Sequence, residues 1–276
     1  MEIILSEYEY LNGRIWNLKK NDANILFELK DGKGFCKKYY HNGTLIYEAE
    51  YLNGEINGIV KEYNKYGTII FEGEYKNGKR NGKGKEYDIN GKLIFEGEYI
   101  NGERNGKGKE YDYDDKLIFE GEYINAERNG KGKEYDNNGK LIFEGEYLKG
   151  KKNGEGKEYN IDDKLIFEGQ YKNGKRDGKG KEYYQYDVNE KLIFEGEYKN
   201  GKRNGKGKEY YDGKLIFEGE YLNGERNGKG KEYYHDGELI FEGEYLNGKR
   251  WNGKVKEYYD KAKLEFEGEY LDDNEF

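Results

Sequence analysis

The sequence predicts an all-β protein, a single-layer antiparallel β-meander of tandem hairpins that forms an elongated, twisted ribbon. Three observations support this prediction. The string Phe-Glu-Gly-Glu-Tyr recurs at a spacing of 24 residues, for example at Phe71, Phe95 and Phe119, and self-similarity at such a period indicates a repeat array. Within each copy, apolar and polar residues alternate with the period of a strand. Asn-Gly and Asp-x-x-Gly turn signals separate the alternating segments.

The composition argues against a conventional thick core. Charged residues make up 38% of the 276 residues, against about 25% in a typical globular domain. The chain also holds 31 tyrosines, whose tips are polar, and 42 glycines. Disorder is equally disfavoured, because 16% of the residues are aromatic and disordered segments are poor in aromatic residues. We therefore expect a thin folded array.

The predicted array covers residues 47–276, and residues 1–46 are predicted to form a divergent N-terminal capping region that contains a half-repeat at residues 7–13. Residues 25–29 predict an extra strand in this region. The spacing grows to 27 residues before Phe194 and to 25 before Phe266, where Trp251 is the added residue. Both insertions are expected in turns, because a longer loop costs little and leaves the strands in register.

The hairpin over residues 71–87 illustrates the predicted register, with a four-residue turn at residues 77–80. The predicted pairs are Tyr75 with Gly82, Glu74 with Lys83, Gly73 with Gly84 and Glu72 with Lys85. Across the next turn, at residues 88–91, Lys83 is predicted beside Glu96 and Gly84 beside Phe95. One face then carries aromatic rings over glycines and the other a Glu/Lys ladder of favourable cross-strand pairs. Because Glu86 falls on the aromatic face beside Leu93, we expect a bulge or a strand end there.

The repeated string closely resembles the MORN repeat, in which an aromatic residue, Glu-Gly-Glu and a second aromatic residue precede Asn-Gly-Lys and a Gly-x-Gly pair. Residues 71–84 read Phe-Glu-Gly-Glu-Tyr-Lys-Asn-Gly-Lys-Arg-Asn-Gly-Lys-Gly. The resemblance extends from residue 47 to the C-terminus, and the Lys-Glu-Tyr second strand is also similar to the bacterial antitoxin-like variant. It implies a single-layer β-meander that mediates protein association, in some members with phosphoinositide or membrane contact.

No catalytic, cofactor-binding or metal-binding residues are predicted. Glu96 and Glu98 lie two apart on one strand face, a spacing compatible with acid/base chemistry, but the same pair recurs beside lysines in almost every copy, which favours a solvated ladder. The segment 78–84 lacks the spacing and the Ser/Thr of a phosphate loop. Cys36, His41 and His235 fall in different repeats, so the sequence predicts neither a Cys-His dyad nor a zinc site. We expect no enzyme and no small-molecule substrate.

Charge and cysteine usage bear on partners and location. The net charge of −8 disfavours a nucleic-acid binder, which needs a basic footprint. A single cysteine excludes an internal disulfide. The first residues carry an acid where a signal peptide has a base, and no stretch approaches the roughly 20 apolar residues of a membrane span. A cytoplasmic location, peripheral to a membrane in the alternative described below, is therefore expected.

The leading hypothesis is a non-enzymatic scaffold that binds a protein partner or a second copy of itself. A single sheet is not expected to bury its own aromatic face, and exposed apolar patches mark interaction sites; curling, a homodimer or a partner would have to cover it. The predicted partner-binding face consists of Phe71, Tyr75, Phe95, Tyr99, Phe119, Tyr123, Phe143, Tyr147, Phe167, Tyr171, Phe194, Tyr198, Phe217, Tyr221, Phe241 and Tyr245.

The alternative hypothesis is a peripheral membrane adaptor. Basic residues occur at the same hairpin end in successive copies, whereas the opposite turns carry acids such as Asp88 and Asp112. Such a row attracts anionic headgroups, although turns that are merely solvated are the favoured explanation. The predicted lipid-binding edge consists of Arg80, Arg104, Arg128, Lys152, Arg176, Arg203, Arg226 and Arg250.

The two tryptophans occupy equivalent places near the two ends of the sequence. Trp16 and Trp251 each follow a Leu-Asn-Gly turn signal. Terminal repeats are atypical because each closes an open sheet edge, so both residues are predicted to be caps; the alternative is that they anchor a partner. A carbohydrate-binding aromatic repeat is a further alternative, disfavoured because such arrays are richer in Trp.

Overall fold

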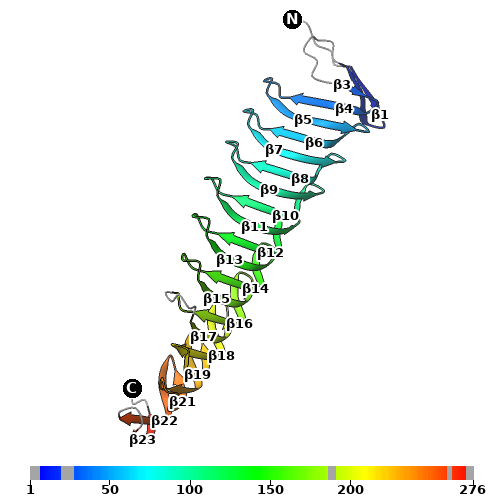
Figure 1. Ribbon diagram of the computed structural model, residues 1–276. Coiled ribbons are helices and arrows are strands. Elements are labelled where there is room, and N and C mark those ends of the chain that lie inside the picture. The colour runs from blue at the N-terminus through cyan, green and yellow to red at the C-terminus, as the bar shows by residue number, and fades with distance from the viewer. Residues whose placement is uncertain (1–6, 20–27, 186–190, 260–262, 272–276) are drawn as a thin grey trace. The chain divides into compact units, whose positions relative to one another are not determined.

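The computed structural model describes residues 7–19, 28–185, 191–259 and 263–271, and the chain divides into two compact units, Met1–Gly139 and Lys140–Phe276. In these ranges the regular elements are β-strands (Figure 1). Within each unit, consecutive strands pair antiparallel. The predicted all-β antiparallel meander is confirmed.

The described residues of the first unit form twelve strands. They are β1 (Glu7–Leu11), β2 (Arg14–Lys19), β3 (Glu28–Lys30), β4 (Lys33–Tyr39), β5 (Leu45–Leu52), β6 (Glu55–Tyr63), β7 (Ile69–Lys76), β8 (Lys79–Tyr87), β9 (Leu93–Ile100), β10 (Glu103–Tyr111), β11 (Leu117–Ile124) and β12 (Glu127–Tyr135). Of the strand predicted at residues 25–29, residues 28 and 29 lie in β3, and residues 25–27 lie outside the described residues.

Eleven strands are found where the structure describes the second unit. They are β13 (Leu141–Leu148), β14 (Lys151–Tyr159), β15 (Leu165–Lys172), β16 (Lys175–Tyr183), β17 (Leu192–Lys199), β18 (Lys202–Tyr211), β19 (Lys214–Leu222), β20 (Glu225–Tyr233), β21 (Leu239–Leu246), β22 (Lys249–Tyr259) and β23 (Lys263–Leu271). The predicted boundary at residue 46 between a capping region and the array stays a prediction.

The hairpin turns at the Asn-Gly edge have two residues, not the predicted four. Asn77 and Gly78 both have positive φ, 52° and 74°, the conformation of the I′ turn that Asn-Gly favours. The predicted pairs of Gly73 with Gly84 and of Glu72 with Lys85 are confirmed. Those of Tyr75 with Gly82 and Glu74 with Lys83 are wrong.

The shorter turn moves one basic residue into the strand. Tyr75 pairs with Arg80, so residues 81–83 oppose Glu74 alone and form a bulge. Gly82 has a φ of 108° in this bulge, a region that favours glycine.

The turn at the opposite edge is one residue longer than predicted. Asp88 donates its backbone N–H to the Lys92 carbonyl at 2.8 Å, which closes a five-residue loop. This extra residue and the bulge between Glu86 and Tyr87 together pair Lys83 with Glu98 and Gly84 with Gly97, two places away from the predicted partners Glu96 and Phe95. The bulge expected at Glu86 is confirmed, and it places this glutamate beside Phe95 instead of Leu93.

One of the two insertions lies in a strand and not in a turn. Trp251 lies in β22, at a register shift between the pairs Tyr245 with Arg250 and Glu244 with Asn252. It is therefore a residue of a bulged strand and not of a turn. The insertion before Phe194 falls mainly on residues 186–190, which lie outside the described residues.

The core is a row of phenylalanines with a different cluster at the N-terminal end of the first unit. There Cys36 packs with Leu29, Ala49, Tyr51 and Val60. Ala49 pairs with Val60 at the place where later hairpins have two glycines. Small aliphatic side chains thus replace the ring-over-glycine packing of the later repeats.

Candidate functional site

The phenylalanine rings are buried although the sheet has a single layer. In the hairpins from β7 to β21 their exposed fraction is 0 to 1%. Phe194 lies over two paired glycines: a Cβ built on Gly207 would approach its Cζ to 2.5 Å. Its sides contact Tyr198 and Tyr221 edge-on, with centroids 5.6 and 5.2 Å apart. The glycines therefore provide the space into which the ring packs.

A cation covers the remaining side of each ring. The Arg203 guanidinium carbon lies 4.1 Å from the Phe194 ring centroid, a cation–π geometry. Arg80 stacks on Phe71 in the same way at 3.9 Å, and Lys152 places its Nζ 3.8 Å from Phe143. The aromatic face is thus covered from within the same chain.

This cover corrects the expectation of an open aromatic face. The predicted face residues do lie together, and the rings do lie over glycines, but the phenylalanines are inaccessible and Tyr99 through Tyr245 of the same row are buried as well. A partner that approached this face would meet arginine, glutamate and lysine side chains first. No second copy is needed to remove the rings from water.

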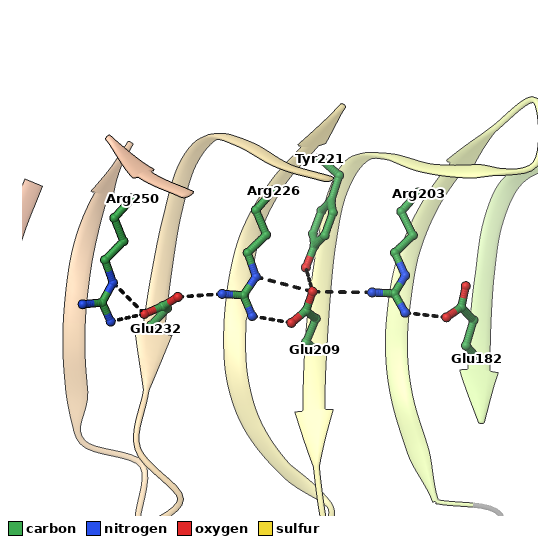
Figure 2. A network of polar contacts seen from close by, with 7 residues as sticks. All are labelled: Glu182, Arg203, Glu209, Tyr221, Arg226, Glu232 and Arg250. Carbon is green, nitrogen blue, oxygen red and sulfur yellow. Dashed lines mark hydrogen bonds and ion pairs between the residues drawn. The ribbon is translucent and has the colours of Figure 1, made fainter. Parts of the chain in front are cut away.

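The arginines also form an ion-pair row with glutamates of neighbouring strands (Figure 2). Arg226 donates from Nη1 to Glu232 Oε1 at 2.6 Å and from Nη2 to Glu209. Glu209 also accepts from the Tyr221 hydroxyl at 2.8 Å. The equivalent residues of the first unit, Arg80 and Glu86, pair at 3.3 Å. Arg80, Arg128, Arg176, Arg203 and Arg226 each bridge two carboxylates while they stack on a ring, whereas Arg250 contacts Glu232.

The ion pairs shift the pKa values of their members. Burial opposes ionisation of Glu209, but the hydrogen bond and charge of Arg226 outweigh it, so the pKa of this carboxyl is lowered. The pKa of Arg226 is raised, because burial is outweighed by Glu209. Burial and the Glu209 charge raise the pKa of Tyr221. Carboxylate and guanidinium are therefore both charged at neutral pH.

The predicted basic edge is corrected by the same geometry. The side chains predicted to meet anionic lipids lie over the phenylalanines, and the arginines among them pair with glutamates. Lys152 stacks on a ring instead of projecting from a turn. The exposed cations of this edge are lysines at and beside the turns, which were not among the predicted residues.

The ring-over-glycine packing gives a testable prediction. Gly207→Ala should destabilise the second unit by about 1–2 kcal/mol, the cost of overpacking a filled core, because the new Cβ would lie 2.5 and 2.6 Å from Phe194 Cζ and Cε2. Urea denaturation followed by circular dichroism measures the loss. Lys206→Ala in the same strand is the control, because Lys206 is exposed and such surface changes usually stay within about 0.5 kcal/mol. Equal losses for both variants would contradict the steric explanation.

The other face is the predicted Glu/Lys ladder. In the second unit Glu195 pairs with Lys181 on one side and Lys208 on the other. Tyr210 donates its hydroxyl to Glu195 at 2.6 Å, and burial together with this contact raises the pKa of Tyr210 to about 12. Tyrosines at the ends of the second strands thus belong to the ladder face, unlike those of the Phe-Glu-Gly-Glu-Tyr string.

The ladder face of the second unit is hollowed into a groove of about 1080 Å³. It crosses the strands from β14 to β21, and its lining consists of eight glutamates, seven lysines and eight glycines. Neither Phe nor Tyr contributes to this lining, so the groove lies on the side opposite the rings. The opposite charges nearly balance, which suits a ligand that carries both signs. We call this feature the ladder groove.

The remaining predicted residues do not form a chemical site. Glu96 accepts from Tyr111 at 2.7 Å and Glu98 from the Lys107 N–H at 3.1 Å, as members of a repeated ladder. Burial raises the pKa of Cys36 to about 11, which disfavours the thiolate. The described residues contain no cluster of His, Cys, Asp and Glu suited to a metal ion.

The two tryptophans both lie in strands. Trp251 is half-buried in β22. Trp16 lies in β2, and its side chain is outside the described residues. Their role as caps or anchors stays a prediction. In the described part of the chain, no helix has the length and apolar character needed to traverse a bilayer.

The same layers of ring, glycine pair, cation and ladder recur in successive hairpins, which defines a β-hairpin repeat protein. The MORN repeat model matches residues 71–92, 95–115, 143–162, 167–185, 194–214 and 217–238, and a MORN repeat variant model matches residues 36–53 and 128–149. These matches cover more than half of the sequence. The chain belongs to the MORN-repeat family. Such repeats are non-catalytic scaffolds for interactions with proteins or membranes.

Comparison with curated proteins and with solved structures does not assign a function to the chain. None of the curated proteins compared matches the sequence. The crystal structure of TcdB2-TccC3 is 13% identical with a TM-score of 0.21, and the match covers 81% of this chain and 14% of that one. The structure of TcdB2-TccC3 without its hypervariable C-terminal region is 12% identical with a TM-score of 0.20, over 96% of this chain and 15% of that one. This chain thus spans a small part of the length of either.

Proposed function

We propose that the protein is a non-enzymatic scaffold that binds an extended segment of a partner protein along the ladder groove of the second unit. The observation that carries the proposal is the groove itself, which measures about 1080 Å³ and lies on the face opposite the buried rings. Among its glycines, Gly169, Gly196, Gly219 and Gly243 are partly exposed between the charged side chains. Such a surface offers a polypeptide both backbone contacts and charge pairs.

The charge balance of the groove selects among partner classes. Eight glutamates against seven lysines create no positive field, and anionic membranes and nucleic acids require one. A protein segment with both acidic and basic side chains pairs with this lining without leaving buried charges unmatched. A protein partner therefore fits the groove better than a polyanion does.

Burial of the aromatic rings gives no reason to expect self-association through that face, because the rings are already covered by arginines. We expect the chain to be a monomer in light scattering coupled to size exclusion, at low and at high salt. A dimer that persists at high salt would favour the homodimer instead. A cytoplasmic location is proposed on the single cysteine alone.

A charge swap tests the groove. The double variant Glu195→Lys with Lys208→Glu keeps the pair between β17 and β18, opposes Lys181 and Glu218 with like charges, and inverts the charges presented to a ligand. We expect it to fold with a small loss of stability and to lose the proteins that the wild-type chain retains in quantitative affinity capture. The same swap of Glu120 and Lys133, which pair in the first unit, is the matched control and should retain them. Equal capture by both variants would exclude the ladder groove as the binding surface.

A further inference from the structure

Six exposed lysines gather on three successive turns of the second unit. Lys149 and Lys151 belong to the β13–β14 hairpin, Lys172 and Lys175 to β15–β16, and Lys199 and Lys202 to β17–β18. All six are exposed. None of them takes part in an ion pair within the part of the chain that the structure describes. We call these six residues the lysine edge.

The lysine edge departs from the pattern of the repeat. In β19–β20 the equivalent positions are Leu222 and Glu225, which face each other across the turn. In the lysine edge, Lys172 instead faces Lys175, and the next hairpin has a second such pair. Like charges directly opposite each other on neighbouring strands are destabilising. A bound anion would relieve this repulsion.

The three turns are held at a fixed spacing. Gly174 donates its N–H to the Lys152 carbonyl, and Gly201 to the Arg176 carbonyl, both at 2.8 Å. The Asn200 N–H donates to Asp177 Oδ2 at 3.1 Å. Two strands per hairpin at about 4.8 Å each place the lysines of successive turns about 9–10 Å apart.

A depression of about 880 Å³ lies between the last two of these turns. It is lined by lysines of the edge together with the side-chain amides of Gln170, Asn173, Asn200 and Asn204. Of its two acids, Asp177 accepts from the Asn200 N–H, and Glu197 lies opposite Lys179 on the neighbouring strand. Gln170 already accepts from the Lys179 N–H and donates to Glu155, which leaves the amides of the three asparagines to donate to and accept from a peptide backbone.

We propose that the lysine edge binds an acidic polypeptide segment in an extended conformation, with a carboxylate at every third residue. A polyproline II segment has three residues per turn and rises about 3.1 Å per residue, so carboxylates at every third residue lie about 9.3 Å apart on one side. This distance matches the spacing of the lysine pairs. The match would place one carboxylate at each turn.

The same features disfavour a lipid bilayer as the ligand. The amides line a depression that a flat surface does not enter. Glu225, on the turn that follows the lysine edge, would face the same bilayer and repel anionic headgroups. An acidic segment that ends before this turn avoids the repulsion.

The test uses two peptides of identical composition and the full chain. One peptide repeats Glu-Pro-Ser four times; its isomer places the four glutamates together. Fluorescence anisotropy should show tighter binding of the first peptide and a loss of affinity with added salt. Lys172→Leu with Lys175→Glu should weaken binding about tenfold, the scale of a few lost exposed charge contacts. This variant copies Leu222 and Glu225, which the repeat itself accommodates.

The matched control is Lys76→Leu with Lys79→Glu in β7–β8, the same change on an isolated lysine pair of the first unit. It should leave the affinity within about twofold. Equal effects of the two variants, or equal binding of the two peptides, would overturn the proposal. Preferential binding of phosphatidylserine vesicles through Lys172 and Lys175 would overturn it in favour of a membrane. The groove swap at Glu195 and Lys208 should not change peptide affinity, which separates this proposal from the proposed function.

Discussion

Phe194→Ala is expected to destabilise the second unit by about 3–5 kcal/mol, the usual cost of removing a fully buried aromatic ring. The exposed fraction of Phe194 is 0%, and its ring contacts glycine backbone, two tyrosines and a guanidinium. Alanine would leave Arg203 over an empty space and remove two edge-on ring contacts at once. The loss should appear in urea denaturation followed by tyrosine fluorescence.

The location of the damage is part of the prediction. In a repeat array each hairpin contacts its neighbours alone, so stability is a sum of local terms. The rate of amide hydrogen exchange should therefore increase in β17 and β18. The increase in β22 should be smaller. Phe35→Ala is the control, because Phe35 is 42% exposed and such surface changes usually stay within about 0.5 kcal/mol. A similar loss in both variants would mean that Phe194 is not packed as described.

The sequence predicted the inner part of the sheet correctly because two independent signals agree there. Gly73 faces Gly84 and Glu72 faces Lys85, as both charge pairing and the space needed by Phe71 require. The turns were harder, because Asn-Gly-Lys-Arg accommodates either a two-residue or a four-residue turn. Local composition does not decide between them.

The predicted function depended on the length assigned to this turn. With a four-residue turn, Arg80 is a solvated loop residue and the rings remain open. With the two-residue turn, Arg80 faces Tyr75 and stacks on Phe71 at 3.9 Å. A shift of two places therefore closes the aromatic face and removes the arginines from the basic edge. The sequence does not predict the ladder groove either, because the groove depends on how the strands bend at their glycines and bulges.

Arg226→Met is expected to cost about 3 kcal/mol at pH 7, at the low end of the range for breaking a largely buried ion pair. Methionine retains apolar contact with Phe217, on which Arg226 now stacks at 4.1 Å. It leaves Glu209 and Glu232 without their shared cation (Figure 2). The neighbouring Arg203 and Arg250 still contact these two carboxylates, which keeps the loss from being larger.

The pH dependence separates charge from packing. The pKa of Glu209 is lowered in the folded protein, so its stabilising contribution is present above the unfolded value of about 4.3 and is lost as the pH falls through the lowered folded value. In the methionine variant this pKa should rise, because the cation is gone. The difference in unfolding free energy between wild type and variant should therefore shrink between pH 5 and pH 3, as measured by urea denaturation.

Arg226→Lys is the matched variant, because the chain itself places Lys152 over Phe143 at the equivalent position. Lysine keeps the charge and the contact with the ring, but a single ammonium does not provide the fork that bridges two carboxylates. The lysine variant should lose about 1 kcal/mol of unfolding free energy, and the pH dependence of its stability should be close to that of the wild type. If the methionine variant were equally destabilised at pH 7 and pH 3, the arginine row would act by covering the rings and not by pairing with the glutamates.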